Sequence, residues 1–179
     1  MTEKQETILA VALRLFARQG YENTPTSQIA KEAGVSEGLI FRHFEHKDGL
    51  LRALIADGQA RVQVLMDQIA RETDPKKVLA RTIDLPLTLI SEEREFWTLQ
   101  FILKHNSKHA AALEAENDYY GTLGGAVGRA FATLGYAQPE RETELLVLLL
   151  EGFGSSLLMP GDSTDPTALV QFIKSKYNV

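Results

Sequence analysis

The 179-residue sequence contains no cysteine. This absence excludes disulfide frameworks, thiolate zinc fingers, iron–sulfur clusters and cysteine nucleophiles. Long hydrophobic runs are also absent: the longest two, residues 8–13 and 145–150, have six residues each, whereas a membrane-spanning helix needs roughly 20. The N-terminal segment has mixed charge and its apolar run ends at Arg14, so we do not expect a secretory signal. The sequence therefore predicts a soluble, cytoplasmic protein.

An excess of positive charge, which often marks nucleic-acid-binding proteins, is missing as well. The net charge is −5 and the isoelectric point is about 5.4. Residues 1–50 carry six Lys/Arg and seven Asp/Glu, whereas residues 51–179 carry thirteen Lys/Arg and seventeen Asp/Glu. Most of the net negative charge therefore lies in residues 51–179. Because the charge of a whole chain does not describe one face of a small domain, nucleic-acid binding is not excluded. The content of 44% hydrophobic and 24% charged residues is typical of globular proteins.

Signals for β-structure are lacking, and apolar residues recur at helical spacing along most of the chain. We therefore predict an all-α fold of about nine helices, with an N-terminal helix-turn-helix three-helix unit followed by a C-terminal helical bundle domain. The expected helices begin and end near residues 4–19, 26–33, 37–44, 47–71, 75–90, 92–104, 110–134, 139–159 and 166–177.

Residues 26–44 give the strongest local signal, because two short helices are joined by a tight turn at residues 33–36. Gly34 permits the turn, and we expect Val35 to be buried between the helices. The apolar side chains expected to face one another are Ile29, Ala30, Ala33, Ile40 and Phe44. Such a small core holds the second helix out from the surface, as a DNA-binding helix-turn-helix requires. A plain helical hairpin with a glycine turn is the alternative.

The residues in and around this turn carry a family resemblance. The anchors are Ile8, Leu9, Ala12, Leu15, Phe16, Gly20, Tyr21, Thr24, Ile29, Ala30, Ala33, Gly34, Val35, Ser36, Gly38, Phe41, Arg42, His43, Phe44, Lys47 and Leu50. In type and spacing, with no gap between them, these residues resemble the N-terminal region of the tetracycline-repressor (TetR) family over about residues 5–55. The resemblance implies a DNA-binding domain at 1–47 and a ligand-binding and dimerisation domain at 48–179.

On this resemblance we expect a transcriptional regulator, most readily a repressor, and not an enzyme. It would bind a palindromic operator in double-stranded DNA as a homodimer and be released by a small apolar or amphipathic effector. The implied DNA-binding residues are Thr26, Gln28, Ser36, Glu37, Gly38, Leu39, Phe41, Arg42, His43 and Lys47. Thr26 and Ser36 are expected to cap helices whose N-termini face phosphates, and Lys47 to contact a phosphate.

Two positions depart from the usual family pattern. Phe41 replaces the usual tyrosine and so lacks a hydroxyl donor for a phosphate. Leu39 stands where a small polar residue is common, and we expect it to point outward if Ile40 is buried. It could then contact a thymine methyl group, or it could be a solvent-facing leucine without a role.

Residues 145–150 are apolar around the whole helix, so this helix needs cover on every face. A second subunit is the natural cover, and the resemblance implies the family's four-helix dimer interface. The expected interface residues are Leu145, Leu148, Leu149, Gly152, Ser156, Leu169, Phe172 and Ile173. The alternative is a helix that is wholly buried within one subunit.

Pro86 lies inside a predicted helix, and a proline there is expected to bend the helix and leave space beside it. Aromatic and polar residues follow, and the resemblance implies an effector pocket among them. The expected pocket residues are Pro86, Trp97, Gln100, Phe101, His105, Tyr119 and Tyr120. Ordinary core packing of these aromatic side chains is the alternative.

Enzyme motifs are absent: the chain has no HExxH, P-loop or GxGxxG pattern. His105 and His109 are four residues apart and could share a helical face toward a metal, but we expect a solvated polar connection there. We therefore predict no metal site and no cofactor. The two rival hypotheses are a DNA-binding regulator without a small-molecule ligand and a metal-dependent helical enzyme that uses the two histidines.

Overall fold

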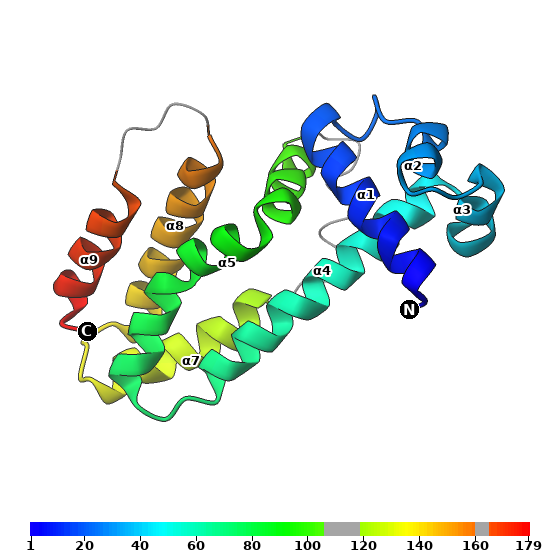
Figure 1. The fold of residues 1–179 in the computed structure, drawn as a ribbon. Coiled ribbons are helices and arrows are strands. Elements are labelled where there is room, and N and C mark those ends of the chain that lie inside the picture. Colours follow the sequence, from blue (N-terminus) through cyan, green and yellow to red (C-terminus); the bar gives the residue numbers. More distant parts are fainter. Residues whose placement is uncertain (106–118, 160–164) are drawn as a thin grey trace. The chain divides into compact units, whose positions relative to one another are not determined.

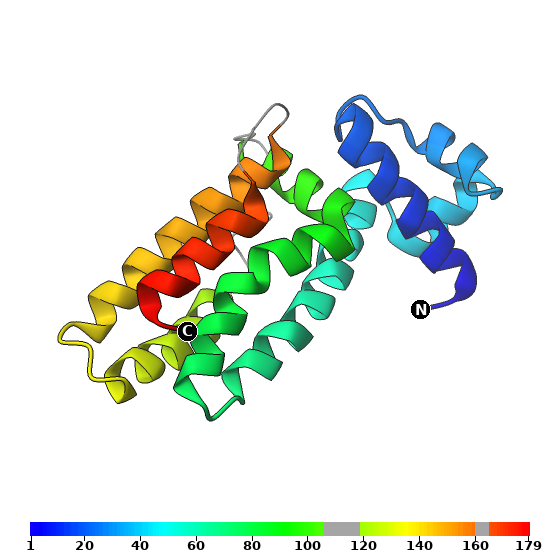
Figure 2. The same cartoon turned by 60° about the vertical axis from the view of Figure 1, so that its left-hand side comes forward.

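The computed structural model describes residues 1–105, 119–159 and 165–179, with eight helices and no strand within these ranges (Figures 1 and 2). The predicted all-α class is confirmed, with one helix fewer than expected. The helices are α1 (Glu3–Gln19), α2 (Thr26–Glu32), α3 (Glu37–Phe44), α4 (Lys47–Ala70), α5 (Pro75–Lys104), α7 (Tyr119–Thr133), α8 (Pro139–Leu158) and α9 (Pro166–Tyr177).

Helix α5 combines the two helices predicted at 75–90 and 92–104. Pro86 lies within it, and the residue with non-helical backbone is Glu93 (φ −132°, ψ 38°). Glu93 lies close to the boundary predicted between these two helices, and the bend that we expected at Pro86 is a separate prediction. Removal of one N–H donor by Pro86 is tolerated, and the helix continues past it.

Local capping explains where several helices begin and end. The Thr2 hydroxyl accepts a hydrogen bond from the Gln5 N–H (3.3 Å), and the Gln5 side chain accepts one from the Thr2 N–H (2.8 Å), which is a capping box. The Asp165 carboxylate accepts bonds from two N–H groups of the first turn of α9, after which Pro166 occupies the first helical position. Asn178, with φ +57°, ends α9 in the left-handed region.

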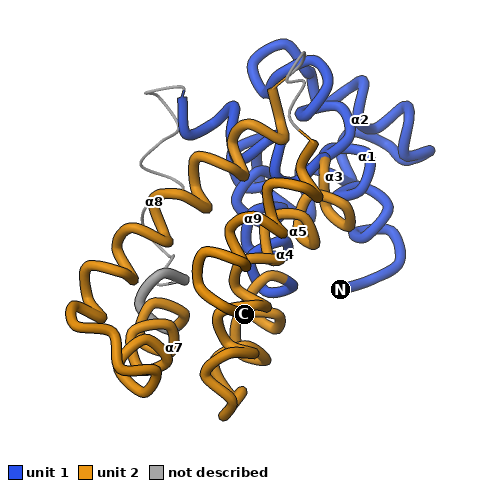
Figure 3. The backbone as a smooth tube through the Cα atoms, turned by 90° about the vertical axis from the view of Figure 1, so that its left-hand side faces the viewer, with its two compact units in different colours: residues 1–61, 95–115 blue, residues 62–94, 116–179 orange. Residues whose placement is uncertain are grey.

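The chain divides into two compact units (Figure 3). Unit 1 comprises residues 1–61 and 95–115, and unit 2 comprises residues 62–94 and 116–179. Helices α4 and α5 thus each contribute residues to both units. The functional boundary expected after residue 47 is a different division and stays a prediction.

The core of unit 1 forms around one face of α1. The buried side chains of this helix include Ile8, Leu9, Ala12, Leu15 and Phe16. Helices α4 and α5 meet closely within the unit, because a Cβ atom added to Gly58 would come within 2.1 Å of the Phe96 ring. Only glycine leaves room for this ring against the α4 backbone.

The core of unit 2 contains an aromatic cluster at the ends of α7 and α9. The Phe131 ring centroid lies 4.9 Å from that of Tyr136 and 5.4 Å from that of Tyr177. The Lys174 ammonium forms a 2.7 Å ion pair with Asp84, which links α9 to α5. Leu146 of α8 is fully buried in the same unit.

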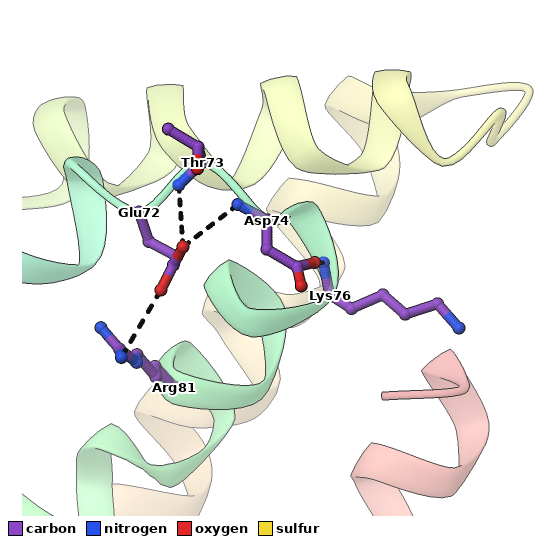
Figure 4. Close-up of polar contacts among 5 residues, drawn as sticks. All are labelled: Glu72, Thr73, Asp74, Lys76 and Arg81. Atoms are coloured by element: carbon purple, nitrogen blue, oxygen red, sulfur yellow. Dashed lines mark hydrogen bonds and ion pairs between the residues drawn. The ribbon is translucent and has the colours of Figure 1, made fainter.

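A carboxylate organises the connection between α4 and α5 (Figure 4). One oxygen of Glu72 accepts hydrogen bonds from the backbone N–H groups of Thr73 (2.9 Å) and Asp74 (3.2 Å), and the other lies 3.5 Å from Arg81. The bond from the Asp74 N–H is the largest cause of a lowered Glu72 pKa. Asp74 then accepts a hydrogen bond from the Lys76 N–H (3.0 Å) at the start of α5.

None of the helices in the described ranges is long and apolar enough to cross a membrane.

Candidate nucleic-acid interface

The turn between α2 and α3 has the compact geometry of a helix-turn-helix. Gly34 adopts φ +65°, a region that favours glycine, and the Val35 N–H donates to the Ala30 carbonyl (3.0 Å). Four of the five apolar side chains predicted to meet across the turn are at most 7% exposed: Ile29, Ala30, Ile40 and Phe44. Ala33 is half-buried. Val35 is also half-buried, which corrects the expectation that it would be enclosed.

Burial of Ile40 and Phe44 turns the opposite side of α3 outward. Gly38, Phe41 and Arg42 are exposed there, and a Cβ at Gly38 would meet nothing within 4 Å. Arg42 makes no hydrogen bond or ion pair with any residue that the structure describes. Recognition helices present such a face to the major groove. Leu39 is half-buried, and its contact with a thymine methyl group stays a prediction.

The first residues of α2 and α3 are joined by a side-chain hydrogen bond. The Thr26 hydroxyl donates to a Glu37 carboxylate oxygen at 2.5 Å, a length typical of a charge-assisted bond. Thr26 is the first residue of α2, and the N-cap is Pro25, so the expected cap by Thr26 is wrong. Ser36 does occupy the N-cap of α3, but its side chain makes no capping hydrogen bond.

Lys47, at the start of α4, is half-buried against the connection between α1 and α2. Its ammonium donates to the carbonyl oxygens of Tyr21 (2.5 Å) and Glu22 (3.5 Å) and lies 4.3 Å from the centre of the Tyr21 ring. Burial lowers the Lys47 pKa. The Tyr21 hydroxyl in turn donates to Asp48. The phosphate contact assigned to Lys47 stays a prediction, and the ammonium has an additional structural role that the sequence did not reveal.

The remaining predicted contact residues lie at the edges of this surface. The Gln28 amide donates to Glu32 (3.2 Å), which also accepts from Arg14 (2.7 Å), and these bonds lower the Glu32 pKa, the one from Gln28 most. The half-buried His43 ring stands edge-on to Phe44, with ring centres 6.1 Å apart. Their roles toward DNA stay predictions.

Comparison with known proteins bears on this geometry directly. Residues 8–54 match the bacterial regulatory proteins of the tetR family, and these residues include α2, the turn and α3. This segment of the chain is therefore similar to the DNA-binding region of tetR-family regulators. The resemblance found in the sequence is thereby confirmed.

Among curated relatives, the regulator AcrR of Shigella flexneri is 36% identical over 106 residues, which cover 56% of this chain and 49% of AcrR. The uncharacterised regulator YerO of Bacillus subtilis is 30% identical over 103 residues, which cover 55% of this chain and 35% of YerO. The matched segment thus spans between a third and a half of these relatives' length.

Solved structures share the fold over nearly the whole chain. A transcriptional regulator of Saccharomonospora viridis in complex with choline has a TM-score of 0.78 at 22% identity, covering 99% of this chain and 97% of the other. The regulator FadR of Bacillus subtilis in complex with stearoyl-CoA has a TM-score of 0.77 at 18% identity, covering 95% of each chain. At this identity, the likeness shows that the chain has the fold of TetR-family regulators.

The interface predicted on α8 and α9 contains exposed apolar side chains in this TetR-family fold. Leu145, Leu148 and Phe172 are 48%, 62% and 67% exposed, and Gly152 is exposed. Leu149, Ser156 and Leu169 are partly exposed. Ile173 is only 2% exposed, so its side chain packs within its own subunit and does not belong to the predicted face. The alternative of an α8 wholly buried in one subunit is wrong.

The residues predicted for an effector pocket do not all fall in one unit. Trp97, Gln100, Phe101 and His105 lie in unit 1, whereas Pro86 lies in unit 2. The first three are half-buried, while His105 is exposed and its Nδ1 lies 2.8 Å from the Phe101 carbonyl. The side chains of Tyr119 and Tyr120 lie outside the described part. The pocket stays a prediction.

Two buried donors in unit 1 have no hydrogen-bond partner among the residues that the structure describes: the Gln59 Nε2 on α4 and the Trp97 Nε1 on α5. Gln59 is only 9% exposed. Sequence reasoning missed Gln59, although a signal existed, since it follows Ile55 and precedes Val62 at helical spacing on the apolar stripe of α4. Unsatisfied buried donors are uncommon in proteins and require a reason.

The described residues hold no cluster of three or more histidine, aspartate or glutamate side chains that could bind a metal. His109, which the rival enzyme hypothesis pairs with His105, lies outside them.

Proposed function

We propose that the chain is a cytoplasmic transcriptional repressor that binds a palindromic DNA operator as a homodimer and is released by a small-molecule effector. The observation that carries the proposal is the exposed face of α3, held out by the buried core of the helix-turn-helix within the segment that matches the tetR family. Arg42 on this face has no partner among the described residues and is available to DNA.

Dimerisation is supported by the apolar side chains that α8 and α9 leave exposed. The two helices lie side by side in unit 2 (Figures 1 and 2), and Leu145, Leu148 and Phe172 are each about half exposed or more. A second copy would bury them, and the exposed Gly152 would permit a close approach. A dimer would place its two α3 helices in successive major grooves, roughly 34–36 Å apart.

An effector is supported by the Gln59 and Trp97 donors, which have no partner in the described part of the chain. A ligand with a hydrogen-bond acceptor beside an apolar body would satisfy them and cover the aromatic residues nearby. The structurally similar regulators were solved with stearoyl-CoA and with choline. Stearoyl-CoA carries carbonyl and phosphate acceptors, so it is the first probe to test.

The experiment begins with selection of operators from a randomised double-stranded DNA library by the full chain. Enrichment of an inverted repeat, bound by a dimer with an affinity that falls as salt rises, supports the proposal. Titration of that complex with stearoyl-CoA, and separately with choline, then tests release. Failure to enrich any sequence overturns the proposal. If the chain binds its operator but no ligand in a broad metabolite screen alters that binding, the hypothesis of a regulator without an effector is favoured.

A further inference from the structure

We propose that Glu37 is a specificity-determining residue that selects cytosine in the operator, and that Thr26 positions it. The inference deepens the proposed DNA-binding function and rests on it. It starts from the 2.5 Å hydrogen bond between the Thr26 hydroxyl and a Glu37 carboxylate oxygen.

Glu37 occupies the position from which bases are read. It is the first residue of α3, and the N-terminal residues of a recognition helix contact base edges in the major groove. Its side chain is half-exposed beside the exposed Gly38, where the backbone carries no obstructing side chain. One turn further along α3, Phe41 and Arg42 continue the same outward face.

A carboxylate at this position needs an explanation, because it repels DNA phosphates and lowers affinity for every sequence. The bond from Thr26 fixes one oxygen, and the other has no partner among the described residues. An ionised carboxylate only accepts hydrogen bonds. The structure therefore presents an oriented acceptor to the groove.

Only some bases can donate to that acceptor. Cytosine itself offers the N4 amino donor and no acceptor in the major groove, whereas adenine carries N7 beside its N6 amino group, and guanine and thymine offer acceptors. The repulsion that a carboxylate meets at guanine O6 and N7 reinforces the choice. We expect cytosine at one position in each half-site, with a mismatch there weakening binding roughly 5- to 100-fold.

The Thr26 hydroxyl gives the contact its direction. It has a single O–H donor, and that donor is hydrogen-bonded to Glu37. Thr26 therefore does not donate to a phosphate while this bond exists. Without the bond, the carboxylate would rotate freely and would lose much of its discrimination. Thr26 is thus a positioning residue that acts through Glu37.

Selection from a randomised duplex library by the full chain tests the proposal, with Glu37→Gln and Glu45→Gln as the matched pair. Both variants remove one carboxylate, and Glu45 is an exposed residue just past the end of α3. In Glu37→Gln, the amide oxygen can keep the Thr26 bond and the N–H₂ group then faces the groove. The cytosine preference should disappear, and bases with acceptors at that edge, guanine above all, should be enriched. Glu45→Gln should keep the wild-type motif.

The role of Thr26 has its own variants. Thr26→Val retains the shape but lacks the hydroxyl and should weaken the cytosine preference severalfold, while Thr26→Ser should restore it. Circular dichroism identifies any variant that fails to fold, and the Glu37→Gln result still decides the proposal in that case. A Glu37→Gln motif that still contains the cytosine, with affinity raised on all sequences as in Glu45→Gln, overturns the inference but leaves the DNA-binding function intact. No enriched motif from the wild-type chain would instead count against the proposed function.

Discussion

Replacement of Leu148 by glutamate is expected to dissociate the proposed dimer while leaving each subunit folded. Leu148 is 62% exposed in the single subunit, so a glutamate at this position can remain hydrated there. In the dimer, the same carboxylate would be buried without a partner, which is costly. The variant therefore separates the stability of the subunit from the stability of the interface.

The magnitude follows from the exposed fraction. Complete burial of a leucine contributes roughly 1.5–3 kcal/mol, so burial of the exposed 62% contributes about 1–2 kcal/mol for each copy. A two-fold symmetric interface contains both copies, which gives about 2–4 kcal/mol for the pair. The dissociation constant should rise roughly 30- to 700-fold from lost burial alone, and desolvation of the two carboxylates should add to this.

Sedimentation velocity over a concentration series measures the dissociation constant of the dimer. Thermal unfolding followed by circular dichroism measures the stability of the subunit. Val64→Glu is the matched control, because Val64 is 56% exposed on α4, outside the proposed interface. Leu146→Ala is the opposite control. Because Leu146 is fully buried, its truncation should lower the unfolding free energy by about 2–5 kcal/mol. A folded Leu148→Glu chain that dimerises like the wild type would refute an interface on α8.

The other predictions concern DNA, ligand and acid stability. Lys47→Met should weaken binding to all DNA sequences and reduce the salt slope by about one, whereas the exposed Lys31→Ala should change either property little; an unchanged slope removes Lys47 from the interface. Gln59→Met should leave the stability against unfolding unchanged or raise it, because it removes an unsatisfied donor. Gln59→Met and Trp97→Phe should both weaken any response to ligand. An intact ligand response in both variants excludes these donors from the site. Glu72→Gln should lower the melting temperature near neutral pH, and the difference should shrink below about pH 4. The reason is that the lowered Glu72 pKa stabilises the fold above the ordinary carboxyl pKa and the benefit is lost as pH falls through the folded value; a pH-independent difference contradicts this.

Features set by neighbouring residues could be predicted from the sequence. Helix α9 was expected from residue 166 to 177 and has those bounds, because the Asp165 cap and Pro166 fix its beginning locally. The turn at Gly34 and the burial of Ile40 were also predicted, since both depend on spacing within one short segment.

Features set by packing between distant segments could not be predicted. Thr26 was expected to cap α2, but its hydroxyl binds Glu37 because the starts of two helices meet in space. The Lys47 ammonium binds carbonyl groups more than twenty residues earlier in the chain. Side-chain contacts of this kind are decided by tertiary packing and override local preference.

Several carboxylates in the acidic segment 1–50 are held by neighbouring side chains. Glu32 is paired with Arg14, Asp48 accepts from Tyr21, and Glu37 accepts from Thr26. These bonds hold three carboxylates in place, so their positions relative to a phosphate backbone are fixed by the fold. Arg42 forms no bond of this kind with the described residues and lies on the outward face of α3. Of the three carboxylates, Glu32 is paired with a cation, whereas Asp48 and Glu37 keep their charge at fixed positions. Whether a segment attracts DNA depends on where its charges lie, and net charge does not measure that.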